Sequence, residues 1–158
     1  MTPIELAALL AQPQYPAMTR LESEITRAWL RLFGIAYDRI EFNVRLGEGV
    51  ELGEGFSEQT RQAALLSTQK RADVIAWLVG QPDVVEVKDR ISLGAIGQLL
   101  GYQLLWNREH PDETIGNLLV IGRNMMPGID VALRQYAIAW LLFPDVREES
   151  ERAVGTTS

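Results

Sequence analysis

The feature that most constrains the fold is a pair of apolar runs that meet at a short turn. Residues 71–79 are rich in Val, Ile, Trp and Leu, and residues 83–88 form the second run. Between them lies Gly80-Gln81-Pro82, a composition typical of turns. The pattern predicts two strands that pair as an antiparallel hairpin.

Charged side chains interrupt this apolar hairpin. Asp73 lies near the start of the first run, and Glu86-Val87-Lys88 ends the second. Because the side chains of a strand alternate between its two faces, Glu86 and Lys88 should point the same way. Charged residues rarely occupy core positions of this kind. The alternative interpretation is an exposed ion pair on an edge strand, which contributes little to stability.

Pairing of the two strands would bring Asp73 beside Glu86. Two carboxylates together with water are the ligands that Mg²⁺ or Mn²⁺ prefers. Such a metal lowers the pKa of a bound water and neutralises the charge that builds on a phosphate. Lys88 would orient that water or stabilise the transition state. The trio therefore predicts metal-assisted hydrolysis.

A helix is expected directly after the hairpin, from Leu93 to about Arg108, with Ser92 as its cap. Its own apolar residues occur on almost every side of the helix, which predicts that the helix is buried. Gln98 and Tyr102 are four residues apart and share one face. A buried Gln amide needs partners, so this pair is a candidate support for the site. The alternative is that Tyr102 only fills the core.

An earlier helix is expected from Arg20 to Phe33, where Thr19 and Glu22 fit a capping box. Its apolar residues recur at helical spacing and should face the core. Glu24 lies at the border of this stripe, from which it would reach over the sheet to the metal. Glu22 is the alternative for that role, and a surface position for Glu24 is equally compatible with the pattern.

These residues together resemble the PD-(D/E)xK nuclease superfamily, and most closely the N-terminal nuclease domain of type I restriction enzyme motor subunits and the RecB-like nucleases. The resemblance covers roughly residues 20 to 125. It implies that Asp73 and Glu86 bind metal, that Lys88 is catalytic, and that a Gln98-x-x-x-Tyr102 helix supports the site and contacts DNA. Glu24 and Arg27 match the upstream helix of these families, and the segment from Gly34 to Tyr37 matches their Gly-aromatic stretch. Ala72 replaces the usual Pro.

The remaining patterns predict an α/β domain with a restriction-endonuclease-like core, in which helices flank a central mixed sheet of four to five strands. The expected order of elements is α-β-β-β-α-β-α-β, with no internal repeat. Residues 1–18 are expected to form an N-terminal extension, 19–144 the nuclease-like domain, and 145–158 a disordered tail. The other expected elements are strands at 39–46, 115–121 and 137–143, a helix at 129–135 and a helical or mobile segment at 57–69.

Composition excludes several kinds of site. The chain has no Cys and a single His, His110, so disulfides, thiolate metal sites and a Ser-His-Asp triad lack their parts. No apolar run reaches membrane-spanning length, and the first residues lack the features of a signal peptide. We therefore expect a cytoplasmic protein without a membrane partner.

The net charge of −6 argues against a general nucleic-acid coat. Basic residues nevertheless gather near the predicted site, and these are Arg61, Lys70, Arg71, Lys88 and Arg90. They form either a phosphate track, with Lys70, Arg71 and Arg90 as candidate DNA contacts, or a solvated face. Binding to DNA should in either case be weak and salt-dependent.

The sequence thus predicts a Mg²⁺- or Mn²⁺-dependent deoxyribonuclease, either alone or as a subunit of a restriction, repair or phage system. A homodimer or a larger nuclease or helicase complex is compatible with it. The alternative is a catalytically silent DNA-binding or assembly protein of phage or prophage origin on a nuclease-like fold.

Overall fold

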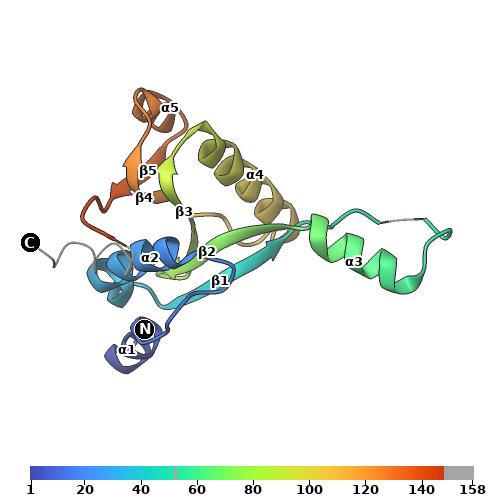
Figure 1. The fold of residues 1–158 in the computed structure, drawn as a ribbon, viewed down its shortest axis with the longest axis horizontal. Coiled ribbons are helices and arrows are strands. Elements are labelled where there is room, and N and C mark those ends of the chain that lie inside the picture. The colour runs from blue at the N-terminus through green and yellow to red at the C-terminus, as the bar shows by residue number, and fades with distance from the viewer. Residues whose placement is uncertain (52, 148–158) are drawn as a thin grey trace, which may run out of the picture.

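The computed structural model describes residues 1–51 and 53–147 and contains a five-stranded sheet in the order β1-β2-β3-β4-β5 (Figure 1). The first three strands pair antiparallel, and β3, β4 and β5 run parallel. The predicted mixed α/β fold is confirmed. The elements are α1 (Pro3–Leu10), α2 (Arg20–Phe33), η1 (Gly34–Ala36), β1 (Arg39–Leu46), α3 (Glu58–Thr68), β2 (Lys70–Leu78), β3 (Gln81–Ile91), α4 (Leu93–Glu109), β4 (Leu118–Met125), α5 (Ile129–Gln135) and β5 (Ile138–Leu142).

Helices cover both faces of the sheet, and each face has its own apolar core. On one face, α2 packs through Ile25 and Trp29 against Val85 and Val87. On the other face, α4 packs against the side of β3 that carries Val84, and α5 packs against α4 and β5. Parallel strands need crossover connections, which explains why α4 and α5 lie between successive parallel strands. No helix in the described ranges is long and apolar enough to cross a bilayer.

The central hairpin is tighter than its sequence predicts. Leu78 pairs with Gln81, so the turn consists of Val79 and Gly80 alone. Both turn residues have positive φ, 51° and 76°, as in the two-residue turns whose twist matches that of paired strands. For this reason β3 begins at Gln81, two residues earlier than expected.

The sheet is irregular where β1 and β2 approach the predicted site. In β1, Phe42 packs on the α2 face, whereas Val44 packs on the α4 face. Asn43 lies between them with φ of 54°, and it lies opposite Asp73, between the pairs Phe42↔Val74 and Val44↔Ala72. This left-handed residue disturbs the regular edge of the strand, as a bulge does. Position 73 thereby lies at an interruption of the regular ladder.

Residues 1–18 lie against the rest of the domain. Tyr15 and Met18 are buried in the α2 core, and the Arg27 guanidinium donates hydrogen bonds to the carbonyl oxygens of Leu10, Gln12 and Pro13. The segment therefore contributes core residues and satisfies a buried arginine. The predicted disordered tail, 145–158, lies outside the described residues from position 148 onward.

Residues 47–51 and 53–69 form a protruding arm that carries α3. Figure 1 shows α3 extending away from the sheet. At the base of the arm, the Val50 amide donates to Thr68 Oγ1 (2.6 Å) and Gln69 Nε2 donates to the Gly47 carbonyl (2.6 Å). A Cβ at Gly49 would lie 1.9 Å from the Leu65 carbonyl oxygen, so only glycine fits there. The arm is thus held at its base, although α3 itself projects from the domain.

Candidate active site

The site begins where β2 and β3 separate. Their register ends at Val74↔Val85, and beyond this point β3 continues to pair only with β4. The Asp73 carboxylate occupies the opening, where its Oδ2 accepts a hydrogen bond from the Val87 amide at 2.8 Å. Since this amide has lost its partner strand, the carboxylate replaces a carbonyl of the ladder. Asp73 is therefore fixed beside β3 by the backbone.

Glu86 and Lys88 follow on the side of β3 that faces α4. The Glu86 side chain is only 1% exposed, and the Lys88 side chain is 29% exposed. Lys88 Nζ lies 2.6 Å from Glu86 Oε1. Neither carboxylate oxygen of Glu86 has a well-directed hydrogen bond from any described residue. The ammonium contacts Oε1 alone and Oε2 is buried without a hydrogen-bond partner among the described residues, so the carboxylate has fewer donors than a buried anion needs.

Burial perturbs the pKa of both carboxylates, and the Asp73 charge adds to the shift at Glu86. Burial, followed by the neighbouring Asp73 charge, raises the pKa of Glu86 to about 7. Burial also raises the pKa of Asp73, although the Val87 amide opposes this shift. For Lys88, burial alone would lower the pKa, but Glu86 and Asp73 outweigh it and hold the pKa above its ordinary value. Without a further cation, the two acids resist double ionisation near neutral pH.

Gln98 and Tyr102 lie together on α4, as their spacing predicts. Gln98 Nε2 donates to the Tyr102 hydroxyl at 3.1 Å. Burial, followed by the negative charge of Glu86, raises the pKa of Tyr102 to about 12. The phenol therefore stays protonated at neutral pH, and its own hydrogen is available to an acceptor near Glu86.

The structure does not bring Glu24 to these residues. Its carboxylate forms an ion pair with Arg27 and lines a surface pocket with residues 10–14. Glu22, in the first turn of α2, is the acidic residue of this helix whose charge acts on Asp73 and Lys88. It also accepts hydrogen bonds from Thr19 in a capping box. Glu22 is thus the α2 carboxylate whose charge influences the site.

The three predicted basic contacts lie on β2 and β3, the strands that carry Asp73, Glu86 and Lys88. Lys70 is exposed at the start of β2, and Arg71 beside it is half-buried. Lys70 also lines a groove of about 580 Å³ along α4, which includes Gln98, Tyr102 and three glycines at positions 94, 97 and 101. Arg90, the third predicted contact, is exposed on β3 two residues beyond Lys88. Lys70 and Arg90 are therefore exposed on the strands that carry the acids, and Arg71 is only partly accessible.

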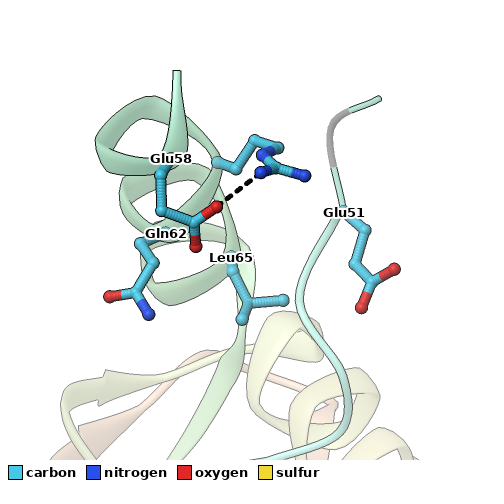
Figure 2. A pocket seen from close by; sticks show the side chains of 5 residues that line it. Glu51, Glu58, Gln62 and Leu65 are labelled. Atoms are coloured by element: carbon cyan, nitrogen blue, oxygen red, sulfur yellow. Dashed lines mark hydrogen bonds and ion pairs between the residues drawn. The ribbon is translucent and has the colours of Figure 1, made fainter. Parts of the chain in front are cut away.

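A further hollow lies on the protruding arm. It is lined by Glu51 and by four residues of α3 (Figure 2). Glu58 pairs with Arg61 within it, and neither the acidic pair nor Lys88 contributes to it. Its acidic character is opposite to that of a phosphate-binding surface.

The acidic pair has the donor set of a small divalent-cation site. No group of three or more Asp, Glu, His or Cys side chains able to hold a metal occurs within residues 1–51 and 53–147. Two carboxylates suffice for Mg²⁺, which retains several waters and binds substrate phosphates. The unsatisfied oxygens of Glu86 and its mutual repulsion with Asp73 are what a divalent cation would relieve. The residues therefore fit Mg²⁺ or Mn²⁺ held by Asp73 and Glu86.

The raised pKa of Glu86 predicts a pH dependence of stability in metal-free protein. Between about 4.5 and about 7 the folded state holds a proton that the unfolded state has released, so the free energy of unfolding falls as pH rises. The full loss is on the order of 3 kcal/mol. Urea unfolding in a chelator across this range should show the decline, and Glu86→Gln should flatten it. An increase in stability over the same range would contradict the buried acidic pair.

No protein family and no curated protein sequence match this chain. A solved structure described as an EndoMS–dsDNA2 complex is similar, with 14% identity and a TM-score of 0.46. The similarity covers 84% of this chain and 48% of the other, so this chain spans about half the length of that protein. At this identity the resemblance concerns the fold alone.

Proposed function

We propose that this protein is a divalent-metal-dependent nuclease that hydrolyses phosphodiester bonds of DNA. The observation that carries the proposal is the Glu86 carboxylate, which is buried beside Asp73, contacts Lys88 through Oε1 and has no hydrogen-bond partner at Oε2 among the described residues. A structural ion pair would have its lone pairs satisfied. A buried acid with a raised pKa is typical of a functional site, here one that would bind a cation.

Asp73 and Glu86 would hold Mg²⁺ or Mn²⁺. When bound, the metal supplies an activated water and neutralises charge on the scissile phosphate. Binding also displaces the proton that the acidic pair otherwise retains. The Val87 amide keeps Asp73 oriented beside β3 throughout.

Lys88 supplies the positive charge on the solvent side of the acids. Its ammonium is partly exposed, remains protonated and is anchored by Glu86. From there it can donate to the attacking water or to an oxygen of the phosphate in the transition state. The Tyr102 oxygen accepts from Gln98, so its own hydroxyl hydrogen is available for the substrate strand or a bound water. Gln98 and Tyr102 are positioning residues in the proposal.

Lys70, Arg71 and Arg90 would contact the phosphates on either side of the scissile bond. Because the whole chain carries a charge of −6, affinity must come from these few contacts and should fall steeply with salt. Such a small basic surface suits either a stand-alone enzyme or a subunit delivered to DNA by a restriction, repair or phage partner.

The test is cleavage of a panel of linear duplex, supercoiled plasmid, single strand and four-way junction with Mg²⁺ or Mn²⁺. The proposal predicts that at least one substrate is cut, that a chelator stops the reaction, and that Lys88→Ala abolishes it. If none of the substrates is cut, although the protein is folded, and if it binds no metal, the remaining role is that of a silent DNA-binding or assembly protein.

Glu22 and Glu24 give a matched pair of variants. Glu22→Gln preserves the capping box, since Gln also fits its last position, but removes a negative charge near Asp73 and Lys88. We expect a reduction in metal affinity of a few fold and a smaller loss of cleavage. Glu24→Gln should leave both quantities unchanged. The comparison is made by metal titration of cleavage, and the reverse ranking would show that Glu24 serves the metal.

A further inference from the structure

The groove along α4 exposes bare helix backbone that the packing of the protein does not require. Gly97 and Gly101 both line it. A Cβ at either position would meet no atom of the described residues within 4 Å, apart from its chain neighbours and the surrounding helix backbone, and neither glycine has a positive φ. Glycine inside a helix is less stable than alanine. The missing side chains therefore leave room for a molecule that approaches α4 from outside.

The walls of the groove are apolar, with one cation at the side. Leu104 is 71% exposed and Leu105 is half-buried, and both line the groove. Lys70, at the start of β2, is the only charged side chain among the described residues that line it. The volume of about 580 Å³ lies in the range of roughly 300–1,000 Å³ that is usual for pockets that hold small organic ligands. An apolar wall beside one ammonium matches the flat apolar face of a nucleic-acid base beside its phosphate.

Tyr102 connects the groove to the acidic site. It lines the groove together with Gln98, and the negative charge of Glu86 contributes to its raised pKa, so the Glu86 carboxylate lies close to it. The Glu86 side chain is only 1% exposed, and its Oε2 has no hydrogen-bond partner in the described part of the chain. A strand that lies in the groove would therefore lead to the carboxylate that lacks partners.

The acidic arm borders the same groove. Its first residue, Gly47, lies against Leu105, because a Cβ there would be 3.0 Å from Leu105 Cδ2. Lys70 directly follows the last residue of the arm. The arm exposes four acids, which are Glu48, Glu51, Glu54 and Glu58. Its one basic residue, Arg61, pairs with the last of them. Negative charge beside the groove repels phosphates, which disfavours a second strand next to the first.

We propose, on the basis of the nuclease function proposed above, that the groove holds an unpaired strand of DNA. Its bases would lie against Leu104, Leu105 and the glycine backbone, and a phosphate would lie at Lys70. A duplex hides the faces of its bases and carries one charge per about 1.7 Å of its axis, so it needs many cations and gains little from an apolar groove. Unpaired bases expose the faces that such a groove can cover. The substrate is accordingly single-stranded DNA or an unpaired segment of a longer molecule.

The test is fluorescence anisotropy of a labelled single-stranded oligonucleotide and of the duplex of the same sequence, in a chelator and at low salt, so that no cleavage occurs. The native chain should bind the single strand about tenfold more tightly than the duplex. Gly101→Leu fills the groove and Leu104→Glu places a negative charge in it. Each should weaken binding of the single strand about tenfold, as loss of one stacked base does. Asn107→Leu and Asn107→Glu are the matched controls at an exposed position of α4 outside the groove, and they should bind as the native chain does.

Two results would overturn the proposal. The first is a duplex bound as tightly as the single strand by the native chain. The second is single-strand binding that both groove variants retain. Leu104 is exposed, so Leu104→Glu remains informative if Gly101→Leu does not fold. Because the binding assay needs neither metal nor cleavage, single-strand binding without any metal response would count against the active site alone. A metal response with equal binding of both DNA forms would count against the groove alone.

Discussion

Glu86→Gln should abolish metal-dependent cleavage and at the same time stabilise the metal-free protein. The substitution keeps the shape of the side chain but removes one of two metal ligands, so we expect cleavage to fall about 10³-fold or more. It also removes a buried acid whose pKa is raised to about 7. At pH 8 in a chelator, its free energy of unfolding should therefore exceed that of the native protein by on the order of 3 kcal/mol.

Loss of cleavage together with a gain in stability distinguishes a metal site from a structural ion pair. If Glu86 served the fold through Lys88, loss of its charge would leave a half-buried ammonium unpaired and destabilise the protein. Asp83→Asn is a suitable control, because Asp83 is also buried but accepts hydrogen bonds from Asn117 and Tyr37. That variant should be destabilised and keep its metal response. A destabilised Glu86→Gln would contradict the account.

Lys88→Met should reduce kcat about 10²- to 10³-fold while metal binding persists. The methionine retains the apolar stem of lysine but cannot donate to water or phosphate. Loss of the ammonium also leaves Glu86 and Asp73 without their nearest cation, so Glu86 should titrate at a higher pH than in the native protein. Single-turnover cleavage as a function of pH measures both effects.

Lys70→Met provides the matched comparison, since Lys70 is a basic residue at the border of the site and forms no ion pair with the two acids in the described part of the chain. It should weaken DNA binding and lower the salt dependence, with the rate at saturating DNA preserved. Equal losses of kcat in the two variants would mean that Lys88 acts only as part of the basic surface.

Much of this architecture could be predicted from sequence because the local signals agree with the fold. Thr19 and Glu22 form the predicted capping box at the start of α2. The helix expected from Leu93 to about Arg108 ends one residue later, at Glu109. The five strands occur in the expected places, although β4 begins at Leu118 rather than Ile115. The Gly116 amide instead donates to the Pro82 carbonyl, and the Asn117 amide donates to the Asp83 carboxylate. The strand therefore begins only after these residues.

The details that shape the site depend on long-range geometry. Asn adopts the left-handed conformation more readily than most residues, but the apolar-polar alternation of residues 39–46 does not predict that Asn43 does so opposite Asp73, where β2 separates from β3. Helical spacing also could not choose between Glu22 and Glu24, because the choice depends on Arg27, which pairs with Glu24 and is itself held by residues 10–13. That partnership lies outside any local pattern.

The central claim is that Asp73 and Glu86 together hold a divalent cation. Its most direct test is thermal unfolding at pH 8 during titration with Mg²⁺ or Mn²⁺, in the native protein and in Asp73→Asn. The account predicts a Tm that rises with metal concentration in the native protein, as expected for a ligand that binds only the folded state, and no rise in the variant. An unchanged Tm in the native protein, or an equal rise in both proteins, would contradict it.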